Sequence, residues 1–209
     1  PSTRTSMGRT EIGGKGTFFW EPNDNIYVRD DKGKFFKSQS NITGTSARFT
    51  FFVNGVYGGN SSYDVYYNGT NSGSDPKKVV IASEQTQVAF NDTKHFGASG
   101  DCGVAKALKK TGQGESGYKF DLEHKASYIC FLPYMATQEQ RDNYKIQRIE
   151  LTSDKNIAGS YELSQLGLSG EGTTNTITLT VGANSEGLLL GDKSVSTQNL
   201  ANSLYMVVA

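Results

Sequence analysis

The chain contains few of the residues that most often carry catalysis or covalent cross-links. Its 209 residues include two cysteines, two histidines and one tryptophan. Because histidine is the side chain that ordinarily titrates near neutral pH, His95 and His124 are the only acid–base groups of that kind. No stretch approaches the roughly 20 consecutive apolar residues of a membrane-spanning helix. These shortages argue against an enzyme and against a helical membrane span.

An excess of either charge is also missing, since 21 basic residues balance 21 acidic ones. A balanced chain has no long-range field that would attract nucleic acid or an anionic membrane surface. The acidic pair Asp30-Asp31 could ligate a cation, but its loop lacks the further acidic positions and the terminal Glu of a calcium-binding hand. We therefore expect no nucleic acid as a partner, no metal site and no cofactor.

Glycine and aromatic residues, in contrast, are plentiful, with 24 Gly, 11 Tyr and 11 Phe. Together with dense Ser and Thr they favour strands and tight turns over helices. Alternation of apolar and polar residues predicts about a dozen short strands, and Ile177, Leu179 and Val181 give the clearest inward face. The expected strands cover residues 17–20, 26–28, 34–36, 47–53, 63–67, 79–82, 87–90, 126–132, 145–151, 160–163, 176–181 and 204–209.

Two kinds of local pattern refine this outline. Residues 126–132 are apolar on both strand faces, which predicts a central core strand. The sequence Thr137-Gln-Glu-Gln140 fits a capping box and predicts a helical turn, and residues 104–110 fit one or two helical turns with Asp101 near the N-cap. The chain is therefore predicted to be an all-β sandwich with short helical turns in its loops. Residues 1–16 are expected to be a flexible lead-in and residues 17–209 the domain itself.

The two cysteines fit either one disulfide or two free thiols. A Cys102–Cys130 bridge would close a loop of about 28 residues and stabilise the fold by roughly 3.5 kcal/mol in the chain-entropy model. A secreted context favours the bridge. The alternative is a buried strand thiol at Cys130 and an unrelated loop thiol at Cys102.

Candidate functional side chains are few. Cys102 near a helix N-terminus, with His95 seven residues upstream, is the most enzyme-like pair, but an exposed loop histidine explains His95 better. Tyr63, Tyr66 and Tyr67 could form a platform on which a sugar stacks, or they could line the rim of the core. Trp20 adjoins Phe18 and Phe19, so core packing is the favoured interpretation of its ring.

Several sequence blocks, in this order, resemble the fimbrillin-like (type V pilin) surface proteins of Gram-negative anaerobes. The resemblance extends from about residue 18 to residue 208, and each block alone is a weak signal. The blocks are residues 19–28, with a Trp-x-x-x-Asp-x-Ile-x-Val pattern, and residues 47–51, 63–67, 85–87, 100–103, 124–131, 149–152, 158–159 and 205–208.

The resemblance implies a transthyretin-like, Greek-key β-sandwich that is the N-terminal domain of such a protein, with a second sandwich expected after Ala209. It also implies lipoprotein export, a lipid anchor in the precursor, and assembly of subunits by β-strand complementation. In that mode an arginine-specific protease removes the first strand and a neighbouring subunit's strand takes its place. Arg4 and Arg9 lie in the lead-in where such a cut would fall.

The expected function is therefore that of a structural or accessory pilin subunit that supports adhesion from the cell surface. Its partners would be other pilin subunits, through donor-strand exchange, and a receptor on a host or microbial surface. The alternative is a surface lipoprotein of the same fold that does not polymerise and acts as an adhesin or glycan-binding module. Fold alone does not separate the two functions.

Overall fold

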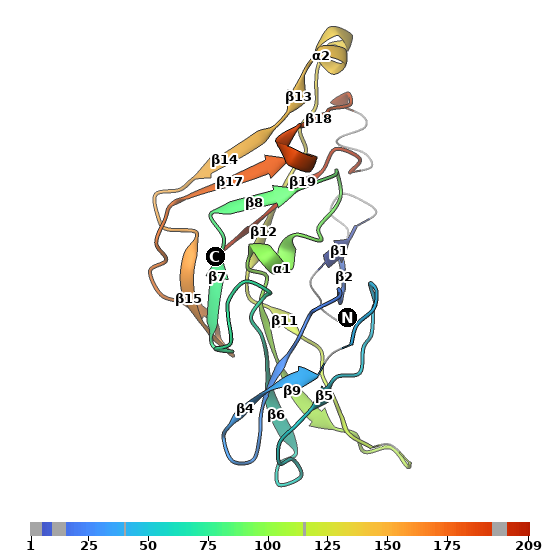
Figure 1. Ribbon diagram of the computed structural model, residues 1–209, viewed down its shortest axis with the longest axis vertical. Helices are drawn as coiled ribbons and strands as arrows, with labels where there is room; N and C mark the ends of the chain where they lie inside the picture. The colour runs from blue at the N-terminus through green and yellow to red at the C-terminus, as the bar shows by residue number, and fades with distance from the viewer. Residues whose placement is uncertain (1–5, 10–15, 40, 115, 194–199) are drawn as a thin grey trace.

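The protein is built almost entirely of short β-strands, as the computed structural model shows (Figure 1). The structure describes residues 6–9, 16–39, 41–114, 116–193 and 200–209. In chain order the elements are β1 (Ser6–Gly8), β2 (Thr17–Phe19), β3 (Tyr27–Arg29), β4 (Phe35–Gln39), β5 (Phe52–Val53), β6 (Ser62–Tyr67), β7 (Lys78–Ile81), β8 (Glu84–Gln87), α1 (Phe96–Ser99), β9 (Gly103–Lys109), β10 (Tyr118–Lys119), β11 (Glu123–His124), β12 (Ser127–Phe131), α2 (Gln138–Asn143), β13 (Lys145–Ile146), β14 (Arg148–Thr152), β15 (Gly159–Ser164), β16 (Gly167–Ser169), β17 (Thr176–Val181), the 3-10 helix η1 (Ala183–Ser185), β18 (Leu188–Leu189) and β19 (Leu204–Val208). The predicted all-β sandwich class is confirmed.

A seven-stranded sheet forms one part of the molecule. Its order is β10-β9-β6-β3-β4-β5, and β11 pairs with β9 beyond the end of β10. Strands β3 and β4, which cover most of the strands predicted at residues 26–28 and 34–36, pair antiparallel as a hairpin. Strand β6 is buried on both faces, because Tyr63, Val65 and Tyr67 belong to one hydrophobic cluster and Tyr66 belongs to another. The sheet therefore separates two cores.

The smaller core confirms the packing role predicted for Trp20. The indole is 4 % exposed. Its ring meets Phe51 edge to face with centroids 4.8 Å apart, and it meets Tyr67 in the same way at 6.0 Å. Such pairs add to the free energy of burying the rings. Residues 47–53, predicted as one strand, form a strand only at β5, although Phe49 and Phe51 still pack against this core.

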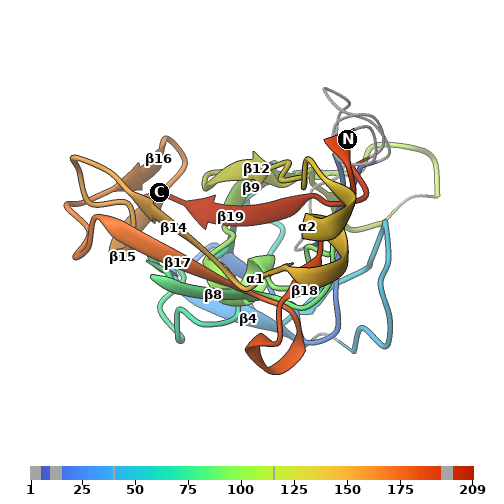
Figure 2. The same cartoon turned by 90° about the horizontal axis from the view of Figure 1, so that it is seen from above.

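The larger core lies among the remaining sheets. Strand β17 pairs with β14 and, in parallel, with β8, while β15 joins β7 to β16. Ile177, Leu179 and Val181 are fully buried, so the inward face predicted from the two-residue period is confirmed. Seen from above, β19 lies between β12 and the sheet of β14, β17 and β8 (Figure 2). This arrangement makes β19 the innermost strand of the region.

The prediction that residues 126–132 form a central strand is wrong. All five residues of β19 are buried, whereas in β12 Ser127 is exposed and the other four residues are half-buried. Among the described residues, β12 pairs only with β19. Residues 126–132 are apolar because they pack against the core, but they do so from an outer strand. Both β12 and β19 are apolar in sequence, and only the strand pairing shows that β19 is the central one.

Helix predictions were right at one place and wrong at another. The capping box at α2 is present, since the Gln140 N–H donates to Thr137 Oγ1 at 3.2 Å and the Thr137 N–H donates to Gln140 Oε1 at 3.3 Å. Residues 104–110, predicted as helical turns, instead form β9, which pairs with β6 along six residues. Pairing with a buried neighbouring strand overrides the weak helical preference of a short segment.

Two further strand boundaries differ from the sequence-based expectation. The strand predicted at residues 87–90 lies earlier, at β8, and the segment after it turns toward α1. The lead-in of residues 1–16 was expected to contain no strand, but β1 occupies Ser6–Gly8 and pairs with β2. Ser6 is buried and donates a hydrogen bond to Glu21 Oε1 at 2.5 Å. A three-residue strand is too short to produce a readable period.

Candidate functional site

The innermost strand, β19, is held on one edge by side chains instead of a neighbouring strand. The Val207 N–H donates to Gln85 Oε1 at 2.9 Å, and Gln85 Nε2 donates to the Val207 carbonyl at 2.7 Å. The Tyr205 N–H donates to Gln87 Oε1 at 2.7 Å, and Gln87 Nε2 donates to the Ser203 carbonyl at 3.1 Å. The two glutamines of β8 thus reproduce the hydrogen bonds of a strand pair through amide side chains.

Burial makes these contacts strong determinants of the fold. Gln85 is 3 % exposed and Gln87 is 1 % exposed, so water does not satisfy the β19 backbone in their place. His95 Nε2 lies 3.1 Å from the Tyr205 carbonyl on the same edge. The pair of glutamines two residues apart was visible in the sequence, but its partners are more than 100 positions away.

Strands β12 and β19 form a two-stranded sheet, and the edge of this sheet opposite the glutamines is the outer edge of β12. Because the Tyr205 backbone groups bond to Gln87 and His95, the Cys130–Tyr205 pair across the ladder is a non-hydrogen-bonded pair. The N–H and carbonyl of Cys130 therefore point away from β19. Within the described parts of the chain, no strand pairs with this outer edge. An edge of this kind is a template on which another strand can add.

The β1–β2 hairpin lies next to this region. The Met7 N–H donates to Thr93 Oγ1 at 2.6 Å, and the same hydroxyl lies 2.8 Å from the Met7 carbonyl. Between the hairpin and β12 lies a cavity of about 300 Å³, lined by side chains that include Phe18, Tyr128 and Cys130. Strand β1 is attached by three residue pairs with β2 and by these few side-chain contacts. It is a small element that covers an apolar surface.

A buried cluster of Asp101, His124 and Tyr128 adjoins this cavity, and the sequence did not reveal it. His124 Nδ1 lies 2.6 Å from Asp101 Oδ1 and 2.8 Å from the Tyr128 hydroxyl, which donates to the same carboxylate oxygen. Asp101 is fully buried. Burial, and then the charge of Asp101, raise the pKa of Tyr128 well above its usual value. Asp101, expected near a helix N-cap, is instead a hydrogen-bond acceptor in the core.

The disulfide predicted between Cys102 and Cys130 is not formed, and both cysteines are free thiols. The Lys125 N–H donates to the Cys102 carbonyl, so Cys102 lies opposite Lys125. Cys130 lies three residues past Ser127, the first residue of β12, which is about 10 Å of extended chain. The Cα atoms of a disulfide must lie within about 7 Å of each other. The strand pairing therefore keeps the two thiols apart.

The enzyme-like pair His95 and Cys102 is not a reactive pair. Burial raises the pKa of the Cys102 thiol far above its usual value, which disfavours the thiolate that a nucleophile needs. His95 was predicted to be an exposed loop residue, but it is mostly buried, and burial lowers its pKa to about 4. Its described hydrogen bond goes to the β19 backbone at Tyr205. His95 has a structural contact in place of a catalytic one.

The proposed sugar platform of Tyr63, Tyr66 and Tyr67 is wrong. The three residues are 4 %, 5 % and 0 % exposed, so none offers a ring face to a ligand. Residues 63 and 67 point into one core and residue 66 into the other, because side chains alternate along β6. Only the Tyr63 hydroxyl reaches a surface pocket, where it donates to Asp31 Oδ1 at 2.7 Å.

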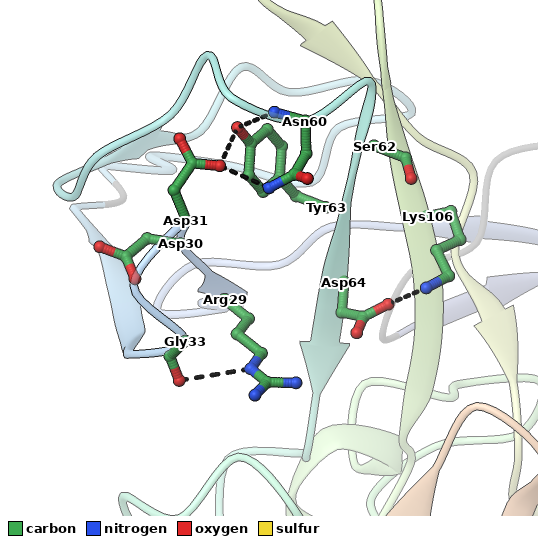
Figure 3. A pocket seen from close by; sticks show the side chains of 9 residues that line it. All are labelled: Arg29, Asp30, Asp31, Gly33, Asn60, Ser62, Tyr63, Asp64 and Lys106. Carbon is green, nitrogen blue, oxygen red and sulfur yellow. Dashed lines mark hydrogen bonds and ion pairs between the residues drawn. The ribbon is translucent and has the colours of Figure 1, made fainter.

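That pocket is polar and shallow, with a volume of about 250 Å³ (Figure 3). Asp31 accepts hydrogen bonds from Tyr63, from the Gly59 N–H at 3.0 Å and from Asn60 Nδ2 at 2.6 Å. The Tyr63 hydrogen bond is the largest cause of the lowered pKa of Asp31, followed by the Gly59 N–H. Lys106 pairs with Asp64 at the opposite rim. The carboxylate of Asp31 therefore anchors the loop of residues 58–60.

The two arginines predicted for protease processing have different positions. Arg4 lies outside the described residues. Arg9 follows β1 directly and is half-buried, and its buried Nε atom has no hydrogen-bond partner among the residues that the structure describes. The Asn91 Nδ2 atom lies 3.5 Å from the Arg9 carbonyl. Arg9 is therefore partly covered by the fold and is not a fully exposed side chain.

Other ligand types find little support in the described part of the chain. There, no three His, Cys, Asp or Glu side chains come together as metal ligands. None of its helices has the length and apolar character needed to cross a bilayer. Comparison with known proteins adds no further constraint, because no family model, curated protein or solved structure matches the chain.

Proposed function

We propose that the protein is a structural or accessory subunit of cell-surface fimbriae that assembles by β-strand complementation. The observation that carries this proposal is the outer edge of β12, which no strand covers among the described residues. Half-buried apolar side chains lie along that edge, including Ile129 and Phe131. An incoming strand would bury them and satisfy the outward backbone groups at once.

Arg9 supplies a route to the assembly-competent state. A cut after Arg9 would release β1 from its three-residue pairing with β2. Loss of Met7 would then uncover the cavity wall formed by Phe18, Tyr128 and Cys130. A strand from a neighbouring subunit would occupy the vacated groove beside β12. Cleavage thereby couples maturation to polymerisation, because the covering strand and the incoming strand compete for one surface.

The wider context of this proposal rests on the resemblance to fimbrillin-like proteins. It includes a transthyretin-like topology, a second sandwich domain, lipoprotein export and attachment at the outer membrane. The partners are other pilin subunits and a receptor on a host or microbial surface. The amide contacts of Gln85 and Gln87 fit this scheme, because a strand bonded through side chains keeps its place while the opposite edge gains a partner.

Limited trypsin digestion of the full chain tests the proposal. We expect a new N-terminus at Thr10 by mass spectrometry and a ladder of oligomers on denaturing gels without boiling. The variant Arg9→Gln should stay monomeric, and Arg4→Gln should behave as the wild type does. A protein that is cut after Arg9 and remains monomeric at high concentration would overturn the proposal.

A second experiment addresses the strand edge itself. Cys130→Pro removes the outward N–H of β12 while leaving the ladder with β19 intact, because the Cys130 backbone faces away from β19. We expect this variant to be cut normally and to form no ladder. The matched variant Cys130→Ala keeps the N–H and should polymerise. Equal polymerisation of both variants would place the assembly contact elsewhere.

The second candidate function is that of a surface adhesin or glycan-binding module that does not polymerise. The polar pocket in Figure 3 favours it, since Arg29, Asn60 and Lys106 offer hydrogen-bond donors of the kind that sugar hydroxyls accept. A monomer that binds a defined glycan and loses it on Arg29→Gln substitution would support this function over the fimbrial one.

A further inference from the structure

Two asparagine–glycine steps occur in the chain, at Asn54-Gly55 and at Asn68-Gly69. Such a step is prone to deamidation, because glycine has no side chain to hinder the approach of its backbone nitrogen to the asparagine amide carbon. Asn54 and Gly55 follow β5 directly, and both are exposed. Within the described residues, neither the Asn54 side-chain amide nor the Gly55 N–H has a hydrogen-bond partner. The reacting groups of this step are therefore open to solvent.

The Tyr57 hydroxyl favours the reaction at this step. It donates to the Asn54 backbone carbonyl at 3.0 Å. When the Gly55 N–H loses its proton, amide resonance places negative charge on that carbonyl oxygen, and a donated hydrogen bond stabilises the charge. Burial, and then the charge of Asp30, raise the pKa of Tyr57 to about 12, so the hydroxyl keeps its proton at neutral pH. Tyr57 therefore stabilises the anion that attacks.

The second step has the same two residues in a protected setting. Asn68 is 2 % exposed. Its Nδ2 atom donates to the Asp75 carbonyl at 2.8 Å and to the Lys78 carbonyl at 3.2 Å. Deamidation expels this nitrogen, so it would break both hydrogen bonds in a buried place. The fold therefore separates two steps that the sequence alone makes equivalent.

We propose that Asn54 is a self-modification site at which the folded protein converts a side-chain amide to a carboxylate. The Gly55 nitrogen gives its proton to solvent and attacks Asn54 Cγ. As the new N–Cγ bond closes a cyclic imide, the Cγ–Nδ2 bond breaks and the nitrogen leaves as ammonia with a proton from solvent. Water then opens the imide at either carbonyl, which leaves aspartate or isoaspartate at this position. Neither the sequence motifs nor the fimbrial proposal assigns this site.

The modified loop is one that contacts the acidic turn between β3 and β4. The Val56 N–H donates to Asp30 Oδ2 at 3.3 Å, and the Val56 carbonyl accepts from the Asp31 N–H at 3.0 Å. The new carboxylate adds negative charge two residues from Val56, and isoaspartate also inserts a methylene group into the main chain. Because like charges repel, these contacts should weaken. Asp30 and Asp31 line the pocket in Figure 3, so modification would alter that rim over time.

Incubation of the full chain in warm, mildly alkaline buffer tests the proposal. Trypsin then releases residues 49–77 as one peptide that contains both asparagines, and fragmentation in a mass spectrometer assigns each conversion. We expect time-dependent conversion at Asn54 and a rate at Asn68 that is lower by about tenfold or more, because the buried site must first open. A sample digested without incubation gives the background. No time-dependent conversion at Asn54, or equal rates at the two asparagines, would overturn the proposal.

Substitution isolates the contribution of the hydroxyl. Tyr57→Phe keeps the ring and should slow conversion of Asn54 by about twofold to tenfold, the factor expected for one lost hydrogen bond. The matched control Tyr144→Phe, at an exposed tyrosine, should leave the rate unchanged. In urea, wild type and Tyr57→Phe should convert equally, because unfolding separates Tyr57 from the Asn54 carbonyl. Equal rates in the folded proteins, or a difference that persists in urea, would refute the role of Tyr57.

Discussion

Replacing Gln85 by methionine removes the amide from β8 while keeping a side chain of similar length. The substitution leaves the Val207 N–H and carbonyl without their partners at 2.9 Å and 2.7 Å. Each unpaired buried backbone group costs about 1–3 kcal/mol, so the expected loss for the two groups is about 2–6 kcal/mol. That is a large part of the roughly 5–15 kcal/mol by which a domain is stable. A loss of about 3 kcal/mol should lower the melting temperature by roughly 6–12 °C.

Urea unfolding followed by tryptophan fluorescence measures the loss, and hydrogen exchange locates it. The Val207 amide should exchange faster in Gln85→Met, while the Met206 amide, which faces β12, keeps most of its protection. The control Gln113→Met, at an exposed loop position, should change the free energy of unfolding by less than about 0.5 kcal/mol. A Gln85→Met protein as stable as this control would refute the conclusion that glutamine side chains hold β19.

Three further predictions follow from buried groups. Burial lowers the pKa of His95 from an ordinary 6.5 to about 4, so its contribution to stability is complete above pH 6.5 and is lost as pH falls toward 4. When the pH is lowered from 7.5 to 4.5, the free energy of unfolding of wild type should therefore fall by about 2–3 kcal/mol more than that of His95→Gln, as measured by urea titration. Equal decreases in the two proteins would contradict a buried neutral His95 ring. Gly100→Ala should destabilise the fold by about 3 kcal/mol or more, because φ is 108° and a Cβ would lie 2.5 Å from the Val80 carbonyl oxygen. The control is Gly73→Ala, where φ is 78° and no described atom lies within 4 Å of the added Cβ. It should cost only about 1 kcal/mol. Reducing agent should leave the urea midpoint unchanged, because both cysteines are free, and a drop equivalent to roughly 3.5 kcal/mol would instead indicate a bridge.

The local parts of the fold could be predicted where a pattern repeats over several residues. Alternation along β17 correctly gave its buried face, and the capping box correctly gave α2. Short elements failed, because β1 has only three residues and β9 resembles a helix when its partner strand is ignored. Both cysteines were visible in the sequence, but their separation depends on the register of β9 and β11.

The sequence by itself determined the β-rich class, the balanced charge and the inward faces of the longer strands, because these depend on composition and on neighbours within a few residues. Only the tertiary structure decided which apolar strand is innermost, which backbone groups Gln85 and Gln87 satisfy, and that Asp101, His124 and Tyr128 meet. These contacts join segments that are far apart in the chain, such as Gln85 and Val207. No local pattern encodes them, since each depends on how the sheets pack.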